Sequence, residues 1–130
     1  MESDRYNYRI ARCTVAFIWI YHGLVPKLFG PHSDELAMIT AVGLTNNQAI
    51  GVSYLGGIGE IIFGFVLLLF WKSRWPLLLS AFSMVGLLIF VVFAQPHLAL
   101  GAFNPVSTNL SACALSVLAY RMPSNWPSSS

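Results

Sequence analysis

The chain alternates between long apolar stretches and short polar segments. Apolar stretches occupy about residues 8–29, 49–71, 76–95 and 105–121. A helix that crosses the hydrocarbon core of a bilayer needs about 20 predominantly apolar residues, and each stretch is close to that length. The pattern therefore predicts an all-α fold, an integral membrane four-helix bundle.

These spans leave little room for anything else, so we expect residues 1–122 to form a single transmembrane domain. The first stretch is too long for a signal peptide and has no small-residue cleavage pattern, so we expect it to be retained. Residues 123–130 are rich in Ser and Pro and predict a disordered tail.

The segment between the first two spans predicts a short additional helix. After a Gly-Pro pair that ends the first span, Ser33 offers an N-cap for a helix running to about Val42. Asp34 and Glu35 fall in its first turn, where the helix dipole favours negative charge. We expect this helix to lie at the outer interface of the membrane, with residues 45–48 as the loop into the second span.

Composition and charge placement support a membrane protein and indicate its orientation. Of the 130 residues, 56% are hydrophobic and only 9% are charged, against about 25% charged in ordinary soluble domains. In the four-span arrangement, six basic residues lie on one side of the membrane: Arg5, Arg9, Arg12, Lys72, Arg74 and Arg121. By the positive-inside rule, both termini are predicted to be cytoplasmic. No basic run suggests a nucleic-acid partner.

The cysteines and histidines argue against two kinds of chemistry. Cys13 and Cys113 fall at different depths in the predicted bundle and form no CxxC pair, which disfavours a thiol oxidoreductase that uses its own cysteines. Only His22 is expected inside a span, whereas His32 and His97 fall in outer loops. This spacing predicts no metal or haem site.

Glu60 lies inside the second predicted span. A carboxylate near the centre of a membrane helix costs about 2.5–3.5 kcal/mol on insertion scales, so it must be protonated, paired or facing water. Gly56 and Gly64 flank it at intervals of four residues, forming a stripe that would let another helix approach closely. We expect Glu60 to face the interior of the bundle, as a functional group or as a structural acid.

His22 and Lys27 lie near the outer end of the first span. Counted at about 1.5 Å per helical residue, His22 and Glu60 come at similar depths, which predicts a contact between them. Pro26 lacks an N–H and is expected to kink the helix and free a carbonyl. The alternatives are that Lys27 snorkels to the interface and that His22 is a hydrogen-bonded interior histidine.

Polar residues mark the fourth span. Asn104 precedes a proline and is expected to cap the helix. Asn109, Cys113 and Ser116 share one face, and such a polar stripe more often joins helices than binds a ligand.

Three motifs occur together along the chain: residues 22–27 (His-Gly-Leu-Val-Pro-Lys), Gly59-Glu60 followed by Gly64, and Phe103-Asn104-Pro105 followed by Asn109. Over about residues 9–121, their combination resembles the DoxX-like family of small four-helix membrane proteins.

The resemblance implies a bacterial-type protein of the cytoplasmic (inner) membrane. Its more distant relatives, the DoxX and DoxD proteins, include some associated with thiosulfate:quinone oxidoreductase or other redox systems. The family resemblance also directs attention to the candidate residues named above: His22, Lys27, Glu60, Asn104 and Asn109. Because the sequence contains no redox cysteine pair or cofactor motif, a thiosulfate activity is not carried over.

These observations lead to one main hypothesis and two alternatives. The main hypothesis is a small redox-associated subunit that binds a quinone-like or other amphipathic ligand in a polar intramembrane pocket. His22 or Glu60 would exchange protons with it, and Lys27 or Asn109 would hold a carbonyl. The alternatives are a proton-linked transporter of a small solute and a structural subunit of a membrane complex. Besides the bilayer, the expected partners are a membrane redox protein or further copies of the chain.

Overall fold

The computed structural model describes residues 2–101 and 104–124, and this part of the chain is helical. Its four long helices are α1 (Glu2–Gly23), α3 (Asn46–Leu69), α4 (Trp75–Ala94) and α6 (Pro105–Arg121). Its shorter elements are the π-helical turn η1 (Leu24–Leu28), α2 (Ser33–Thr40) and α5 (Pro96–Ala99). The predicted all-α class is confirmed, whereas most of the predicted tail lies outside the described residues.

Among the described helices, α3 and α4 are long and apolar enough to cross a membrane. The segment Glu2–Leu28 forms a third candidate span if it is counted together with α2, which follows at a bend of 87°. The fourth predicted span, α6, has 17 residues and falls outside this set. Length and composition therefore support two or three of the four predicted spans.

Several helix boundaries differ from the prediction for local chemical reasons. α3 begins at Asn46, within the segment 45–48 that was expected as a loop, because Thr45 and Gln48 form a capping box across the first turn. The side chain of His32, and not Ser33, accepts the hydrogen bond that caps α2. A short helix, α5, follows α4 where only a loop was expected.

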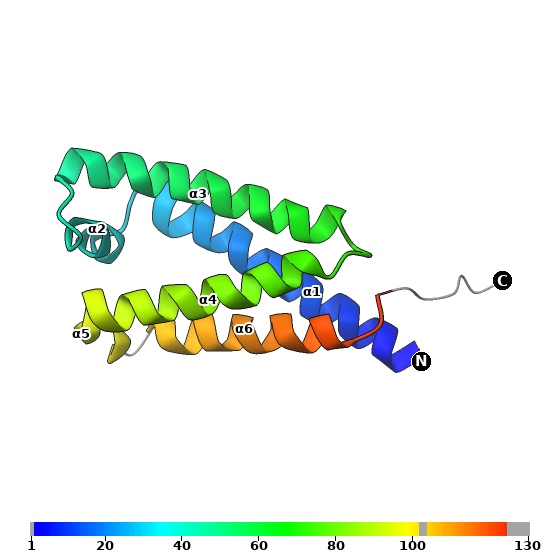
Figure 1. Cartoon of the computed structure of the whole chain (residues 1–130). Coiled ribbons are helices and arrows are strands. Elements are labelled where there is room, and N and C mark those ends of the chain that lie inside the picture. The colour runs from blue at the N-terminus through cyan, green and yellow to red at the C-terminus, as the bar shows by residue number, and fades with distance from the viewer. Residues whose placement is uncertain (1, 102–103, 125–130) are drawn as a thin grey trace.

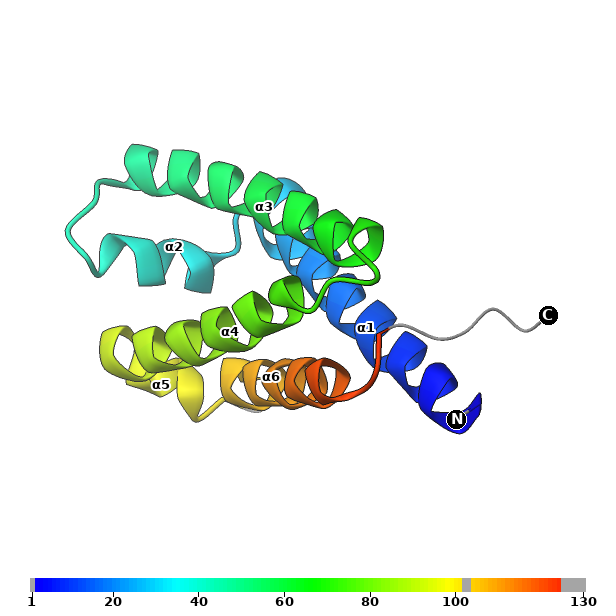
Figure 2. The same cartoon turned by 45° about the vertical axis from the view of Figure 1, so that its right-hand side comes forward.

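The long helices are arranged in two pairs, shown in Figures 1 and 2. α3 lies along α1, α4 lies along α6, and α1 also packs against α6. α3 and α4 meet at the turn that joins them and then diverge (Figures 1 and 2). α2 packs against α3 at the end of the molecule opposite the α3–α4 turn. There the side chain of Gln95, which follows α4, donates a hydrogen bond of 3.2 Å to the carbonyl of Ala37 in α2.

Close packing of α1 against α3 depends on glycines. A Cβ atom on Gly57 would lie 2.7 Å from the carbonyl oxygen of Gly23, and one on Gly64 would lie 2.5 Å from the Ile20 side chain. Neither distance is sterically acceptable, so these residues let the two helices approach backbone to backbone. Near Glu60, the residue of α3 that the backbone of α1 approaches closely is therefore Gly57. At Gly56, an added Cβ would meet only the ammonium of Lys27, at 3.7 Å.

A buried polar chain joins α1 to α4 and α6. The indole N–H of Trp19 donates to the Ser80 hydroxyl at 2.8 Å, and the hydroxyls of Ser80 and Ser116 lie 3.0 Å apart. Ser116 also donates to the carbonyl of Ala112, one turn earlier in its own helix. Ser116 therefore contributes to helix association, as the polar face of the fourth span suggested.

Arg12 is fully buried and binds the end of α3. Its guanidinium donates hydrogen bonds to the carbonyls of Leu67, Phe70 and Ser73, at 2.6, 2.6 and 2.8 Å. The last carbonyls of a helix have no intrahelical partner and carry the negative end of the helix dipole. Arg12, which the sequence suggested only as one of the charges that set orientation, thus satisfies these groups from the neighbouring helix.

Tyr8 completes this arrangement. Its hydroxyl accepts a hydrogen bond of 2.5 Å from Arg12 and donates one of 2.6 Å to the carbonyl of Trp71. The Tyr8 and Trp71 rings also meet edge to face, with centroids 5.7 Å apart. Together, these two residues of α1 fix the turn that leads from α3 to α4.

Replacing Arg12 with alanine should lower the free energy of unfolding by about 3 kcal/mol or more, because several charge-assisted hydrogen bonds are lost and the Leu67 carbonyl stays buried. Denaturant titration in mixed micelles would measure this. The matched control is Arg9→Ala, which removes an exposed arginine from the same helix and should change stability little. Equal losses in the two variants would contradict the assigned role of Arg12.

Candidate functional site

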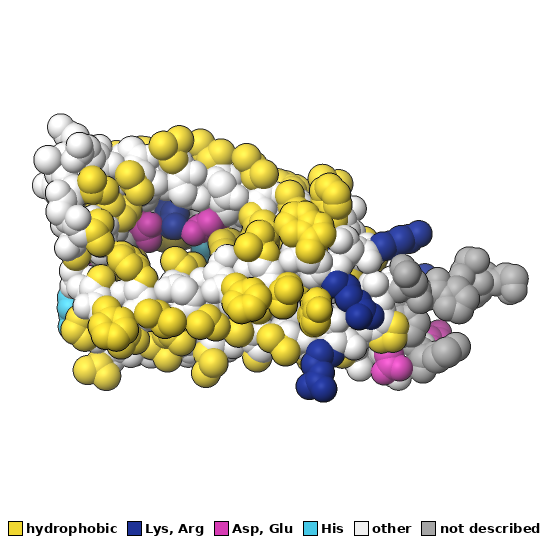
Figure 3. All heavy atoms as spheres, viewed as in Figure 1, with side chains coloured by type: hydrophobic (Ala, Val, Ile, Leu, Met, Phe, Trp, Pro, Cys, Tyr) yellow, Lys and Arg dark blue, Asp and Glu magenta, His cyan; other side chains and the backbone are white. Residues whose placement is uncertain are grey.

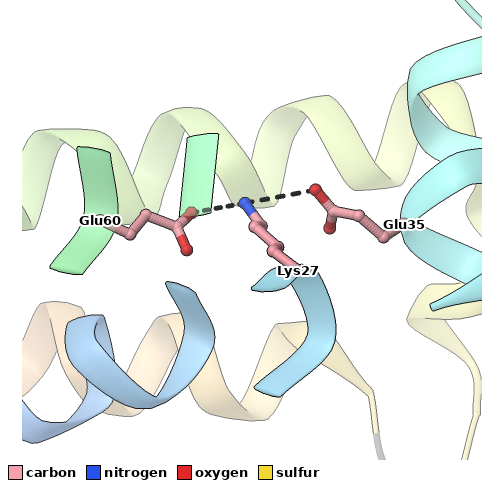
Figure 4. A network of polar contacts seen from close by, with 3 residues as sticks. All are labelled: Lys27, Glu35 and Glu60. Atoms are coloured by element: carbon pink, nitrogen blue, oxygen red, sulfur yellow. Dashed lines mark hydrogen bonds and ion pairs between the residues drawn. The ribbon is translucent and has the colours of Figure 1, made fainter. Parts of the chain in front are cut away.

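Lys27 lies between two carboxylates, as Figure 4 shows. Its ammonium is 2.6 Å from Oε1 of Glu60 and 3.2 Å from Oε1 of Glu35. All three side chains are largely buried, with exposed fractions of 14% for Lys27, 14% for Glu60 and 17% for Glu35. The triad formed by Glu35, Lys27 and Glu60 connects η1 with α2 and α3.

The backbone around Pro26 brings Lys27 and Glu35 together. The chain passes Pro26 in a π-helical turn, in which the N–H of Phe29 donates to the carbonyl of Leu24 at 2.9 Å. The sharp change of direction follows at residues 29–32, where Gly30 adopts a φ of +132° that favours glycine. α2 then starts at a steep angle to α1, and its first turn carries Glu35 back to Lys27.

Glu60 projects from the middle of α3 toward this turn. Gly56, one helical turn earlier, leaves space for the ammonium of Lys27. Glu60 uses Oε1 for the ion pair, whereas its Oε2 is buried and has no hydrogen-bond partner in the described part of the chain. The hydroxyl of Ser53, two turns earlier on the same helix, is also buried without a hydrogen-bond partner among the described residues. An unsatisfied buried acceptor is costly and marks a place where a donor is missing.

A groove of about 400 Å³ opens between α3 and α4 beside the triad. In the space-filling view of Figure 3, acidic and basic side chains are visible at the bottom of a hollow that has apolar side chains around it. The groove is lined by Trp19, Gly56, Gly59, Glu60, Phe63, Leu79, Ser83 and Leu87. Its walls are therefore mainly apolar, and Glu60 is the ionisable residue among them.

Two aromatic rings shape the inner wall of the groove. Trp19 and Phe63 meet edge to face, with ring centroids 4.8 Å apart. The indole N–H is already hydrogen-bonded to Ser80, which holds the ring in place. The wall next to Glu60 is thus aromatic.

The other predicted site residues are placed differently. His22, in the last turn of α1, is close enough to interact with the charges of Lys27 and Glu35. Glu60 is hydrogen-bonded to Lys27 through Oε1, and its Oε2 has no partner among the described residues, so no hydrogen bond from His22 to Glu60 accompanies their similar depth.

Asn104 and Asn109 belong to α6. Asn104 caps this helix by accepting a hydrogen bond of 2.9 Å from the N–H of Ser107, and it donates one of 2.9 Å to Gly101. Asn109 is buried, with 5% of its surface exposed. In the part of the chain that the structure describes, neither asparagine lines the groove.

A family model described as the DoxX-like family matches residues 16–117. The chain belongs to the DoxX-like family. The matched range of this DoxX-like protein contains the triad and every residue that lines the groove, whereas Tyr8 and Arg12 precede it. No curated protein and no solved structure gave a significant match.

The described residues of the DoxX-like protein gather no group of three His, Cys, Asp or Glu side chains suited to a metal ion. Cys13 is exposed, Cys113 is half-buried, and both are free thiols. The chemistry available at the groove is therefore that of a carboxylate, its ammonium partner and a nearby imidazole.

Lys27→Met should destabilise the DoxX-like protein by about 3 kcal/mol, because it leaves two carboxylates buried without their shared cation. The double variant Lys27→Met/Glu60→Leu should recover at least half of that loss, since it also removes the stranded acid. Unfolding in mixed micelles would measure both variants. If the double variant is less stable than the single one, the ion pair is not what Lys27 contributes.

Proposed function

We propose that this DoxX-like protein is a multi-pass protein of the bacterial-type cytoplasmic membrane, in which residues 1–122 form one domain of four spans. In support, large apolar side chains point outward along α3 and α4, among them Leu55, Phe82 and Phe93, which are 72%, 68% and 83% exposed. A bilayer would remove this apolar surface from water. α6 would cross with about 25 Å of helix at 1.5 Å per residue, close to the hydrocarbon thickness.

The proposed orientation places both termini and the turn between α3 and α4 in the cytoplasm. Lysine and arginine side chains gather at the end of the molecule where the two termini lie, as Figure 3 shows. These exposed cations belong to the positive-inside pattern of the sequence. The triad and α2 would then lie toward the outer leaflet.

Labelling of single cysteines in intact cells tests this topology, in a background where Cys13 and Cys113 are replaced by serine. A membrane-impermeant maleimide should label Asn47→Cys, at the exposed start of α3. It should label Ser73→Cys, in the opposite turn, only after the cells are opened. The reverse pattern, or equal labelling of both positions from outside, would contradict the proposed orientation.

We further propose that the groove binds an amphipathic ligand, of which a quinone-like compound is one kind. The observation that carries this proposal is the combination of an apolar groove of about 400 Å³ with one carboxylate whose Oε2 has no described partner. Binding sites for small molecules are mostly apolar, with a few polar groups that orient the ligand. Glu60 would orient the polar head, and the walls from α3 and α4 would hold the apolar body.

The residues around Glu60 would have supporting roles. Lys27 holds one carboxylate oxygen and is itself held by Glu35, so it fixes the direction of the acid. His22 interacts with the charges of Lys27 and Glu35, and its imidazole would exchange protons with this network. As a redox-associated subunit, the protein would present a bound ligand to a partner that supplies or removes the electrons.

Native mass spectrometry of the protein released from mild detergent tests ligand binding. Wild type should carry a bound small molecule, and Glu60→Gln should lose it because the acid that orients the head is gone. Asp34→Asn is the matched control, since Asp34 is an exposed acid in α2, with 56% of its side chain accessible.

Equal recovery of ligand from wild type and Glu60→Gln would contradict the proposal. A bare wild-type chain would favour the proton-linked transporter that the sequence also suggested. A stoichiometric protein partner that depends on Glu60 would favour the structural subunit.

A further inference from the structure

We propose that the groove between α3 and α4 selects a lipophilic organic cation, such as a protonated amine on an apolar body, and pairs its head with Glu60. This inference rests on the proposed function, because it names the class of amphipathic ligand that the same groove would take.

The first argument is the charge of the triad. One ammonium, on Lys27, serves two carboxylates, on Glu35 and Glu60, at 3.2 and 2.6 Å. With these three groups ionised and the nearby His22 neutral, the network carries one negative charge in excess, in a place with little solvent. Buried charge is tolerated when it is paired, so the site is complementary to one additional positive charge.

The second argument is the hydrogen-bonding capacity of Glu60. Its Oε2 is enclosed and lacks a donor among the described residues, and an ionised carboxylate can only accept hydrogen bonds. An ammonium N–H satisfies this oxygen, whereas the carbonyl of a quinone does not. Glu60 lines the groove while Lys27 holds its Oε1, so Oε2 is the carboxylate oxygen left for a donor on the ligand.

The third argument is the wall of the groove. Trp19 and Phe63 line it together with Glu60, and aromatic faces attract organic cations through the ring quadrupole. Leu79 and Leu87 provide apolar surface on the side of α4. A metal ion would find no suitable set of ligands among the described residues, whereas an organic body fits both walls.

Three probes of nearly equal shape test the charge preference: 4-phenylbutylamine, 4-phenylbutanol and 4-phenylbutyrate. Binding would be measured calorimetrically at pH 7 on the full chain in nanodiscs of zwitterionic lipid, with empty nanodiscs as the blank. Wild type should bind the amine at least tenfold more tightly than the alcohol, and the carboxylate most weakly. Glu60→Gln should lose the preference for the amine, whereas the control Asp34→Asn should keep it.

An alcohol that binds wild type as tightly as the amine would overturn the cation inference and leave the proposed ligand site standing. A preference for the amine that survives in Glu60→Gln would overturn the inference as well. If no probe binds and native mass spectrometry finds no ligand, the proposed function itself fails. If Glu60→Gln does not fold, Phe63→Leu is tested in its place. Because this variant removes an aromatic ring from the groove, its affinity for the amine must fall by a larger factor than its affinity for the alcohol.

Discussion

The last turn of α3 ends among neighbouring side chains, where its free carbonyl groups need donors other than water. Arg12 and Tyr8 of α1 supply them, and this requirement determines how α3 is placed along α1. With that end held, Gly57 and Gly64 allow the two backbones to approach closely. Close approach then brings Glu60 of α3 to Lys27 at the other end of the pair. Arg12 and the ion pair of Lys27 with Glu60 thus join α3 to its partner near opposite ends.

The second pair of helices is attached more loosely to the first. α4 lies along α6, and the hydrogen bond from Trp19 to Ser80 joins this pair to α1 through the interior. Beyond that point α3 and α4 separate, and the side chain of Gln95, which follows α4, donates a hydrogen bond to the carbonyl of Ala37 in α2. The space left between the helices is the groove. The groove is open because α3 pairs with α1 and α4 pairs with α6, which leaves α3 and α4 apart.

Much of the fold follows from patterns visible in the sequence. The apolar stretches predicted the four long helices, and the Asn-Pro pair at residues 104–105 predicted the start of α6. The predicted start of α3 was too late, because residues 45–48 were expected as a loop although Thr45 and Gln48 have the spacing of a capping box. The glycine spacing indicated that α3 approaches another helix closely, but periodicity alone could not distinguish Gly56 from its neighbour Gly57, which makes the contact.

The site was less predictable because its partners come from different elements. Counting residues along the helices placed Glu60 and His22 at the same depth in the membrane. Depth does not show in which direction around the helix a side chain points, and the residue that pairs with Glu60 is Lys27. Glu35 looked like a first-turn acid of an outer helix, since nothing in the local sequence shows that α2 bends back over η1. Arg12 looked like a surface charge, because the carbonyls that it binds belong to a segment more than fifty residues away.

The π-helical turn at Leu24–Leu28 affects how relatives of this chain can be compared. A π-turn closes its hydrogen bond over five residues instead of four, so it accommodates one residue more than an α-turn. Within the turn, successive side chains are separated by a smaller angle than the roughly 100° of an α-helix, because more residues complete each turn. A helical wheel drawn with α-helical spacing through this segment would therefore give the wrong direction for Lys27, which lies in the turn itself. An alignment of relatives with one residue fewer there would match the lysine in sequence while displacing it in space.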